Sequence, residues 1–120
     1  MLLNLSNHPS ANWPEEQRKA AIPYGEIIDL PFPVVDPFAS ESAIAELSSQ
    51  YVEKIRSYGP PADVTIHLMG EFCFTYNLLH ALRELGYTCV ASTTTRKVMF
   101  EEGVKKVLFE FCLFRKYWTL

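Results

Sequence analysis

Residues 64–91 decide the fold, with the sequence Val-Thr-Ile-His-Leu-Met-Gly-Glu-Phe-Cys-Phe-Thr-Tyr-Asn-Leu-Leu-His-Ala-Leu-Arg-Glu-Leu-Gly-Tyr-Thr-Cys-Val-Ala. Residues 64–69 are rich in β-branched side chains and predict a strand that ends at Gly70. An apolar stripe at helical spacing follows, formed by Phe74, Leu78, Leu82 and Leu85. Gly86 is well placed to cap that helix, and residues 87–91 predict the next strand. A strand, a helix and a strand in this order predict two parallel strands joined by a right-handed crossover.

The same alternation extends toward the N-terminus. Residues 2–5 predict a strand, and the helix that follows is predicted to run to Ala21. Asn12 can cap this helix, with Glu15 completing a capping box. Residues 26–30 predict the second strand.

A further helix is predicted to begin at Ser40 or Ser42 and to close at residues 59–61, with an apolar face formed by Ile44, Leu47, Tyr51 and Ile55. The whole pattern predicts an α/β fold: a mostly parallel sheet in the order 2-1-3-4, with helices on both faces.

The C-terminal segment predicts a β-hairpin that extends the sheet. Its arms are residues 97–100 and 104–117, joined by a turn at Glu101-Glu102-Gly103. In the second arm one face is apolar and the other is half apolar. We therefore expect this strand to be partly covered on both sides.

Composition limits the class of protein. The chain has 120 residues, of which 48% are hydrophobic, so we expect one domain over residues 1–120. With 11 basic and 14 acidic residues the net charge is −3, which argues against a protein that coats long nucleic acids. A chain this short buries a limited share of its surface, so pairing into a dimer would help it.

Cysteines and the N-terminus indicate the compartment. Cys73, Cys89 and Cys112 have no paired spacing, and their apolar surroundings predict three small buried hydrophobes. No apolar run approaches the roughly 20 residues of a membrane span. Residues 1–5 lack the features of a signal peptide. These observations favour a reducing cytoplasm.

Ligands of open parallel sheets bind beyond the carboxyl ends of the strands, where the order reverses. The first loop expected there contains Ser6, Asn7, His8 and Ser10, with Trp13 just after it. Hydroxyl and amide groups before a helix suit a phosphate, and Trp13 could stack a base. His8 is the best candidate for proton transfer. The alternative is an ordinary capped turn. His67 and His80, inside a strand and a helix, are expected to be structural.

The second expected loop runs from residue 69 to residue 77. Gly70 permits a close approach of a ligand to the backbone. Thr75 and Asn77 could bond a phosphate or a base edge. Glu71 could hold a ribose hydroxyl, or it could simply cap the helix.

The third expected loop is residues 92–97, Ser-Thr-Thr-Thr-Arg-Lys. Four hydroxyls followed by two cations would surround phosphate oxygens, and Arg96 can make a bidentate contact. The alternative is a strand that continues into the hairpin, because threonine favours strands. The sequence shows no Walker loop, GxSxG, HExxH or CxxC, and no spacing that suggests a metal site, so we expect neither a metal nor another cofactor.

The segment Ser6-Asn7-His8-Pro9 after a short strand, and Met69-Gly70-Glu71 before a helix, resemble compact CRISPR-associated proteins of the CARF type over roughly residues 1–95. This group has a Rossmann-like fold and includes stand-alone ring nucleases and binders of cyclic oligoadenylate. The resemblance implies a cytoplasmic homodimer in antiviral defence, which binds the cyclic messenger across its two-fold axis without a metal.

Cleavage in such proteins proceeds by attack of a ribose 2′-hydroxyl on the adjacent phosphate, giving a 2′,3′-cyclic phosphate. By this resemblance, Ser6, Asn7 and His8 would face the ligand backbone, and Gly70 and Glu71 would line the floor. Thr94, Thr95 and Arg96 would hold phosphates. His8 is the expected general acid or base, and Arg96 would stabilise the charge that develops.

Three other functions stay open. A protein that only sequesters the same ligand would use the same residues. A protein-interaction module would use the aromatic tail, which contains Phe109, Phe111, Phe114, Tyr117 and Trp118. An enzyme acting on a small phosphorylated metabolite would use the same loops.

Overall fold

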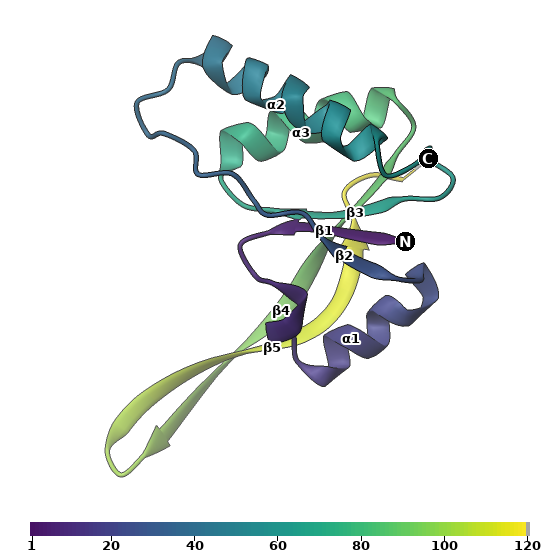
Figure 1. Cartoon of the computed structure of the whole chain (residues 1–120). Helices are drawn as coiled ribbons and strands as arrows, with labels where there is room; N and C mark the ends of the chain where they lie inside the picture. Colours follow the sequence, from purple (N-terminus) through teal and green to yellow (C-terminus); the bar gives the residue numbers. More distant parts are fainter. Residues whose placement is uncertain (120) are drawn as a thin grey trace.

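The computed structural model describes residues 1–119 and has one five-stranded sheet with helices on both faces (Figure 1). The strands are β1 (Leu2–Ser6), β2 (Ile27–Asp29), β3 (Thr65–Met69), β4 (Thr88–Glu101) and β5 (Val104–Lys116). Their order is β2-β1-β3-β4-β5, with β1 to β4 parallel and β5 antiparallel to β4. This confirms the predicted α/β class, the order 2-1-3-4 and the C-terminal hairpin.

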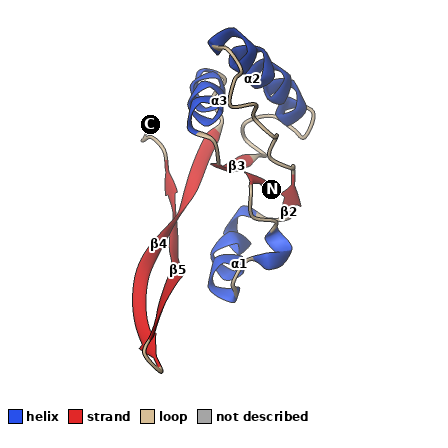
Figure 2. Ribbon diagram, turned by 90° about the vertical axis from the view of Figure 1, so that its left-hand side faces the viewer, coloured by secondary structure: helices blue, strands red, loops and turns tan. Residues whose placement is uncertain are grey.

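The helices form two layers around the sheet. They are α1 (Glu15–Ala21), α2 (Glu41–Arg56) and α3 (Phe72–Glu84), with short 3-10 turns η1 (Ser10–Asn12) and η2 (Ile22–Tyr24). Helices α2 and α3 lie side by side on one face, and α1 lies on the opposite face (Figures 1 and 2). At the carboxyl edge of the sheet, a loop therefore meets either α1 or the pair α2 and α3, depending on the face on which it lies.

Each face of the sheet has its own core, because successive strand side chains point to opposite faces. Leu3 packs in the larger cluster under α2 and α3, whereas Leu2 packs in the smaller one under α1. The predicted helix stripes are confirmed by the buried side chains Ile44, Tyr51, Ile55, Phe74, Leu78 and Leu82. Leu85 is exposed, because α3 ends one residue before it.

The helix starts agree with the sequence in one case and differ in another. The Oγ of Ser40 accepts a hydrogen bond from the Ala43 amide at 3.1 Å, as predicted for a cap of α2. The predicted capping box of Asn12 and Glu15 is wrong. Pro14 stands before α1 and no side chain caps it, because Asn12 is the last residue of η1.

The hairpin starts earlier than predicted. β4 continues without a break from Thr88 to Glu101, so residues 92–97 are strand and not loop. They pair with β5 along their whole length, with a bulge between Thr93 and Thr94. The expected third loop is therefore wrong, and its alternative, a threonine-rich strand that continues into the hairpin, is confirmed.

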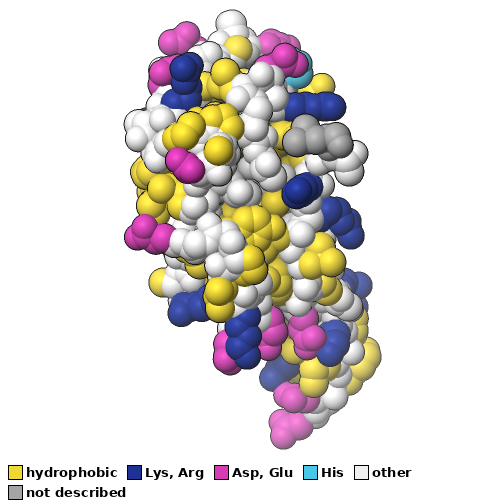
Figure 3. Space-filling view, turned by 90° about the vertical axis from the view of Figure 1, so that its right-hand side faces the viewer, with side chains coloured by type: hydrophobic (Ala, Val, Ile, Leu, Met, Phe, Trp, Pro, Cys, Tyr) yellow, Lys and Arg dark blue, Asp and Glu magenta, His cyan; other side chains and the backbone are white. Residues whose placement is uncertain are grey.

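The distal part of the hairpin protrudes from the body, and neither of its faces is covered (Figure 2). Figure 3 shows hydrophobic atoms beside charged ones along this arm. The large apolar side chains exposed in the hairpin include Val98, Met99, Phe100, Val104, Leu108 and Phe109. The expectation that the strand is partly covered on both sides is wrong for this single chain. Only Phe111 and Phe114, near the root, are half-buried.

The expectation that all three cysteines are buried is also wrong. Cys89 is buried in the sheet, but Cys73 on α3 and Cys112 on β5 are exposed. Over residues 1–119 no helix is long and apolar enough to cross a membrane.

Candidate functional site

A pocket of about 510 Å³ lies beyond the carboxyl ends of β1 and β3, on the face of the sheet that carries α1. We call it the rim pocket. It is lined by the connection from β1 to α1, by the ends of β3, and by β4 and β5, through Asn7, His8, Pro9, Asn12, Trp13, Pro14, Gln17, His67, Met69, Ser92, Thr94 and Phe109. The pocket lies where the strand order reverses, the usual ligand position in an open parallel sheet.

Asn4 connects the three strands beneath this pocket. Its Nδ2 donates hydrogen bonds to Oδ1 of Asp29 on β2 at 2.8 Å and to the His8 carbonyl at 2.9 Å. Its Oδ1 accepts a hydrogen bond from Oγ of Ser6 at 2.8 Å and lies 2.8 Å from Nδ1 of His67 on β3. Because Nδ2 faces two oxygen acceptors, the orientation of the amide is fixed.

The orientation of Asn4 also fixes the tautomer of His67. An amide oxygen cannot donate, so Nδ1 of His67 must carry the proton and donate to Asn4. In the neutral ring Nε2 is then an acceptor, and it lies 3.1 Å from Oγ of Ser92. Oγ of Ser92 also lies 3.1 Å from the Sδ of Met69, but a thioether is a weak acceptor, so the hydroxyl donates to the imidazole.

Burial keeps this imidazole neutral. His67 is 1% exposed, and the loss of solvation lowers its pKa from 6.5 to about 4, with the nearby His8 adding to the shift. Trp13 and Phe114 pack edge-on against the ring at centroid distances of 5.3 and 5.5 Å. A neutral base with an oriented lone pair on a hydroxyl is an arrangement that can accept a proton from a reacting group.

The first predicted loop lies at the rim pocket in part. Asn7 and His8 are exposed and line it. Ser6 is buried and lines a separate, neighbouring pocket with Asn4 and Asp29, and the hydroxyl of Ser10 donates to Asp29 at 3.0 Å. Trp13 lines the pocket but is 5% exposed, and its indole N–H donates to the His8 carbonyl at 3.0 Å. Its ring is thus part of the core, which corrects the expectation that it is free to stack a base.

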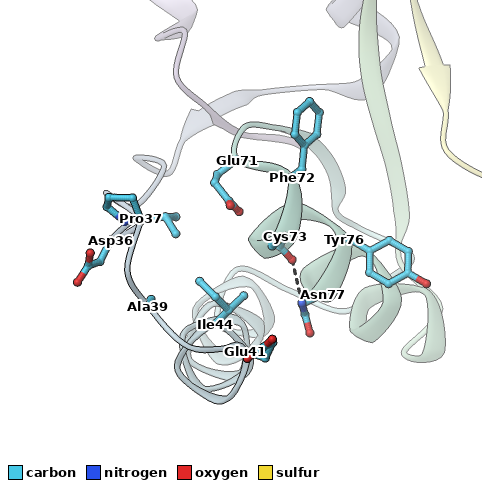
Figure 4. A pocket seen from close by; sticks show the side chains of 11 residues that line it. Asp36, Pro37, Ala39, Glu41, Ile44, Glu71, Phe72, Cys73, Tyr76 and Asn77 are labelled. Carbon is cyan, nitrogen blue, oxygen red and sulfur yellow. Dashed lines mark hydrogen bonds between the residues drawn. The ribbon is translucent and has the colours of Figure 1, made fainter.

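The second predicted loop lies on the other face of the sheet. Glu71 and Asn77 line a separate pocket of about 720 Å³, which we call the helix pocket, between the β2–α2 connection and the starts of α2 and α3 (Figure 4). The carboxylate of Glu71 accepts a hydrogen bond from the Phe74 amide, and the amide of Asn77 donates to the Cys73 carbonyl. The interpretation of Glu71 as a helix cap is confirmed. The expectation that all three segments line one pocket is wrong.

The helix pocket is poorly suited to an anion. Three carboxylates line it, those of Asp36, Glu41 and Glu71, and no Lys, Arg or His is among its lining residues within the described chain. Gly70 is required for packing, since a Cβ there would lie 2.1 Å from Cζ of Phe32. Thr75 is buried in α3, and its hydroxyl has no hydrogen-bond partner.

The third predicted segment contributes through one face of β4. Thr94 lines the rim pocket, whereas Thr95 points to the opposite face, where its hydroxyl lies 2.9 Å from Sγ of Cys112. Arg96 is exposed and lies outside the pocket lining. Its register partner is Phe109, which lines the pocket, so Arg96 shares the face of Thr94 beside the opening.

Sequence reasoning missed Asn4, His67, Ser92 and Phe109. Asn4 and His67 occur inside apolar strands, where polar side chains require buried partners, and that signal could have identified them. The pairing that joins them across β1 and β3 is not visible in the sequence.

Comparison with known proteins places the chain in one family. No curated protein and no solved structure shows significant similarity to it. The model of the uncharacterized protein MJ1673 family matches residues 1–115, which is nearly the whole chain. The chain therefore belongs to the MJ1673 family.

Proposed function

We propose that this protein binds a cyclic oligoadenylate at the rim pocket and cleaves it without a metal, as a CARF-like, Rossmann-like homodimer of the cytoplasm. The observation that carries the proposal is the neutral His67, which holds an oriented acceptor nitrogen on Ser92 in a pocket beyond the carboxyl ends of β1 and β3. Polar groups of two further segments surround that pair: Asn7 and His8 from the first connection and Thr94 from β4.

In the proposed reaction the ribose 2′-oxygen attacks the adjacent phosphorus, and the bond from phosphorus to the 5′-oxygen breaks. The 2′-hydroxyl proton passes to Ser92 as the Ser92 proton passes to Nε2 of His67. His8 protonates the leaving 5′-oxygen, and the product is a 2′,3′-cyclic phosphate. Arg96, beside the opening, stabilises the charge that develops on the phosphate.

A second candidate is sequestration of the same ligand without cleavage. The observation that favours it is the charge of the rim pocket, because no Lys or Arg is among its lining residues in the described part of the chain. Phosphoryl transfer gains much of its rate from cations fixed at the developing charge. A single arginine at the margin of the rim pocket offers little of this stabilisation.

Native mass spectrometry with a panel of cyclic and linear oligonucleotides tests binding and stoichiometry together. We expect one cyclic oligoadenylate per two chains. Arg96→Ala should weaken binding by about 1.5–3 kcal/mol, as loss of one charged hydrogen bond does. The matched control is Arg56→Ala at the end of α2, on the other face of the sheet, where Arg56 pairs with Glu53 at 3.6 Å. The absence of binding by every member of the panel would refute the proposal.

Chromatography of the products separates the two candidates. His67→Gln should abolish cleavage and leave binding in place, and His80→Gln, on the exposed side of α3, should change neither. If the unmodified protein binds the ligand and returns it intact, sequestration is the function.

A further inference from the structure

The distal hairpin is an exposed arm that a second protein surface should cover. Phe100 is 73% exposed and Phe109 66% exposed, and Leu108 on the opposite face is 45% exposed. A two-stranded hairpin without further support is marginally stable in water. Apolar side chains on both faces of such an arm are typical of a surface that is buried in an assembly. Figure 3 shows hydrophobic atoms among charged groups on the side of the arm that faces the viewer.

The outer edge of β5 is free to pair. Within residues 1–119, β5 is the last strand of the sheet, and β4 is its one strand partner. The turn has positive φ at both Glu102 (50°) and Gly103 (78°), as in a two-residue hairpin turn. Such a turn is closed by a hydrogen-bonded pair, here Glu101 and Val104.

Counting from that pair shows which backbone groups face the free edge. Hydrogen-bonded and non-hydrogen-bonded pairs alternate along an antiparallel ladder. Residues 104, 106, 108 and 110 therefore direct their N–H and C=O groups toward β4, and residues 105, 107, 109 and 111 direct theirs outward. An added antiparallel strand must bond to this outward set, so only every second register is possible.

The charges of β5 select among these registers when the added strand is another β5. Within one chain Glu110 pairs with Lys97 at 3.0 Å and Lys106 pairs with Glu101 at 2.8 Å. If Leu108 lies on the two-fold axis, Glu110 also stands opposite the partner's Lys106, and the two intrachain pairs join into one row of alternating charge that occurs twice.

An axis at Val107 or Phe109 is also allowed, but it places Glu110 opposite an apolar residue and forms no ion pair. An axis at Glu110 opposes two glutamates, and an axis at Lys106 opposes two lysines, both of which are unfavourable. The bulge at Cys112 inverts the alternation along β5, so Lys116 directs its backbone groups outward and cannot stand opposite Glu110.

We propose that two copies of the chain assemble through their β5 edges, antiparallel, with Leu108 on the two-fold axis. The two sheets then become one, and the exposed edge of each hairpin is paired. On one face of the joined sheet, four side chains lie next to one another across the strands: Lys97, Leu108, the partner's Leu108 and the partner's Lys97. One Glu110–Lys106 pair lies on each side of this row. This assembly gives an interface to the homodimer of the proposed function. It needs no ligand, so the mass of the ligand-free protein tests it separately from binding and cleavage.

The pairing also adds to the wall of the rim pocket. Phe109 lines that pocket, and in this register it stands beside the partner's Val107. Phe111 stands beside the partner's Lys105 on the same face. A pocket without a lysine of its own would thereby have one from the second copy near its margin.

Charge reversal tests the interface by light scattering on a sizing column. The unmodified protein should have twice the chain mass of 13.7 kDa. Glu110→Lys alone and Lys106→Glu alone should each be monomeric, because each opposes like charges across the axis. An equimolar mixture of the two variants should again form dimers, since every cross-axis pair is then of opposite charge. Lys116→Glu is the matched control: it reverses a charge on β5 outside the proposed pairing and should stay dimeric.

Disulfide formation tests the same register without reliance on charge. In a background with Cys73→Ser and Cys112→Ser, Leu108→Cys should cross-link two copies on oxidation, because the two Cα atoms of an axial non-hydrogen-bonded pair are close enough for a disulfide. Val104→Cys, four residues from the axis, should not. A monomeric unmodified protein, or a mixture that fails to restore the dimer, or cross-linking through Val104→Cys in place of Leu108→Cys, would overturn the proposal.

Discussion

Oδ1 of Asn4 lies 2.8 Å from Nδ1 of His67, and this contact joins β1 to β3 where the strand order of the sheet reverses. Both side chains are almost completely buried, at 2% and 1% exposure. The contact satisfies two polar groups in the sheet and also directs the acceptor nitrogen of His67 toward the rim pocket. One pair of residues therefore links the stability of the fold to the chemistry of the candidate site.

Removal of the Asn4 amide should destabilise the protein. Asn4→Ala leaves Nδ1 of His67 without its acceptor, whereas the hydroxyl of Ser6 keeps the His8 carbonyl at 3.2 Å. One buried unsatisfied donor costs about 1–3 kcal/mol. We expect urea denaturation to show a loss of at least that size. Asn7→Ala, at an exposed position of the neighbouring turn, is the matched control and should change the free energy of unfolding by less than about 0.5 kcal/mol. Equal losses in both variants would contradict this account.

The tautomer of His67 can be observed directly. Long-range ¹H–¹⁵N correlation spectra at neutral pH should show a proton on Nδ1 and none on Nε2, because Nδ1 donates to Asn4. Ser92→Ala removes the contact at Nε2 and should leave the tautomer unchanged. A ring protonated at Nε2 would show that the Asn4 amide has the opposite orientation.

Stability should depend on pH through His67. Its pKa is about 4 in the folded protein and 6.5 when unfolded, so between these values the unfolded chain binds more protons. The free energy of unfolding should therefore be fully retained above pH 6.5, fall as the pH drops toward 4, and lose about 3 kcal/mol in total. Thermal unfolding across this range should show a much smaller slope for His67→Gln.

A side chain at Gly70 should destabilise the protein while Phe32 keeps its present position. In Gly70→Ala the new Cβ would lie 2.1 Å from Cζ of Phe32, which itself packs edge-on against Phe74 at 5.3 Å. Overpacking of this kind costs about 1–3 kcal/mol. Adding Phe32→Leu should recover part of that loss, and a double-mutant cycle on denaturation midpoints measures the coupling. Additive effects of the two substitutions would refute a steric origin.

The cysteines should differ in reactivity. Burial raises the pKa of the Cys89 thiol to about 12, so this thiol has little thiolate and no access to reagents. Cys73 and Cys112 are exposed. A colorimetric thiol titration should therefore count two groups in the folded protein and three after denaturation. Three reactive thiols in the folded protein would place Cys89 outside the core.

The fold was predictable to the extent that its signals are local. Strands and helices from residue 2 to residue 91 follow from side-chain periodicity, and the order of the four parallel strands follows from their alternation with helices. The error at residues 92–97 arose because a run of Ser and Thr suits both a loop and a strand. Residues 92–97 are strand because they pair with β5, and this pairing joins residues that are separated in the sequence.

The candidate site was less predictable, because its central residues are polar groups inside apolar strands. Asn7, His8 and Thr94 were expected at a ligand site and do line the rim pocket. Glu71 and Asn77 were expected beside them but line the helix pocket on the other face of the sheet. The face on which a connection emerges depends on how its helix packs, which the sequence of the connection does not contain.

By itself the sequence determined an α/β chain with four parallel strands, a C-terminal hairpin and helix faces of known composition, because periodicity and turn residues act over a few positions. Only the tertiary structure decided that Asn4, His67 and Ser92 form one hydrogen-bonded chain. It also decided that the predicted polar loops line two pockets on opposite faces of the sheet, and that the apolar side chains of the distal hairpin are exposed to solvent. The physical reason is that these contacts join residues up to 63 positions apart, and strand register and helix packing bring them together.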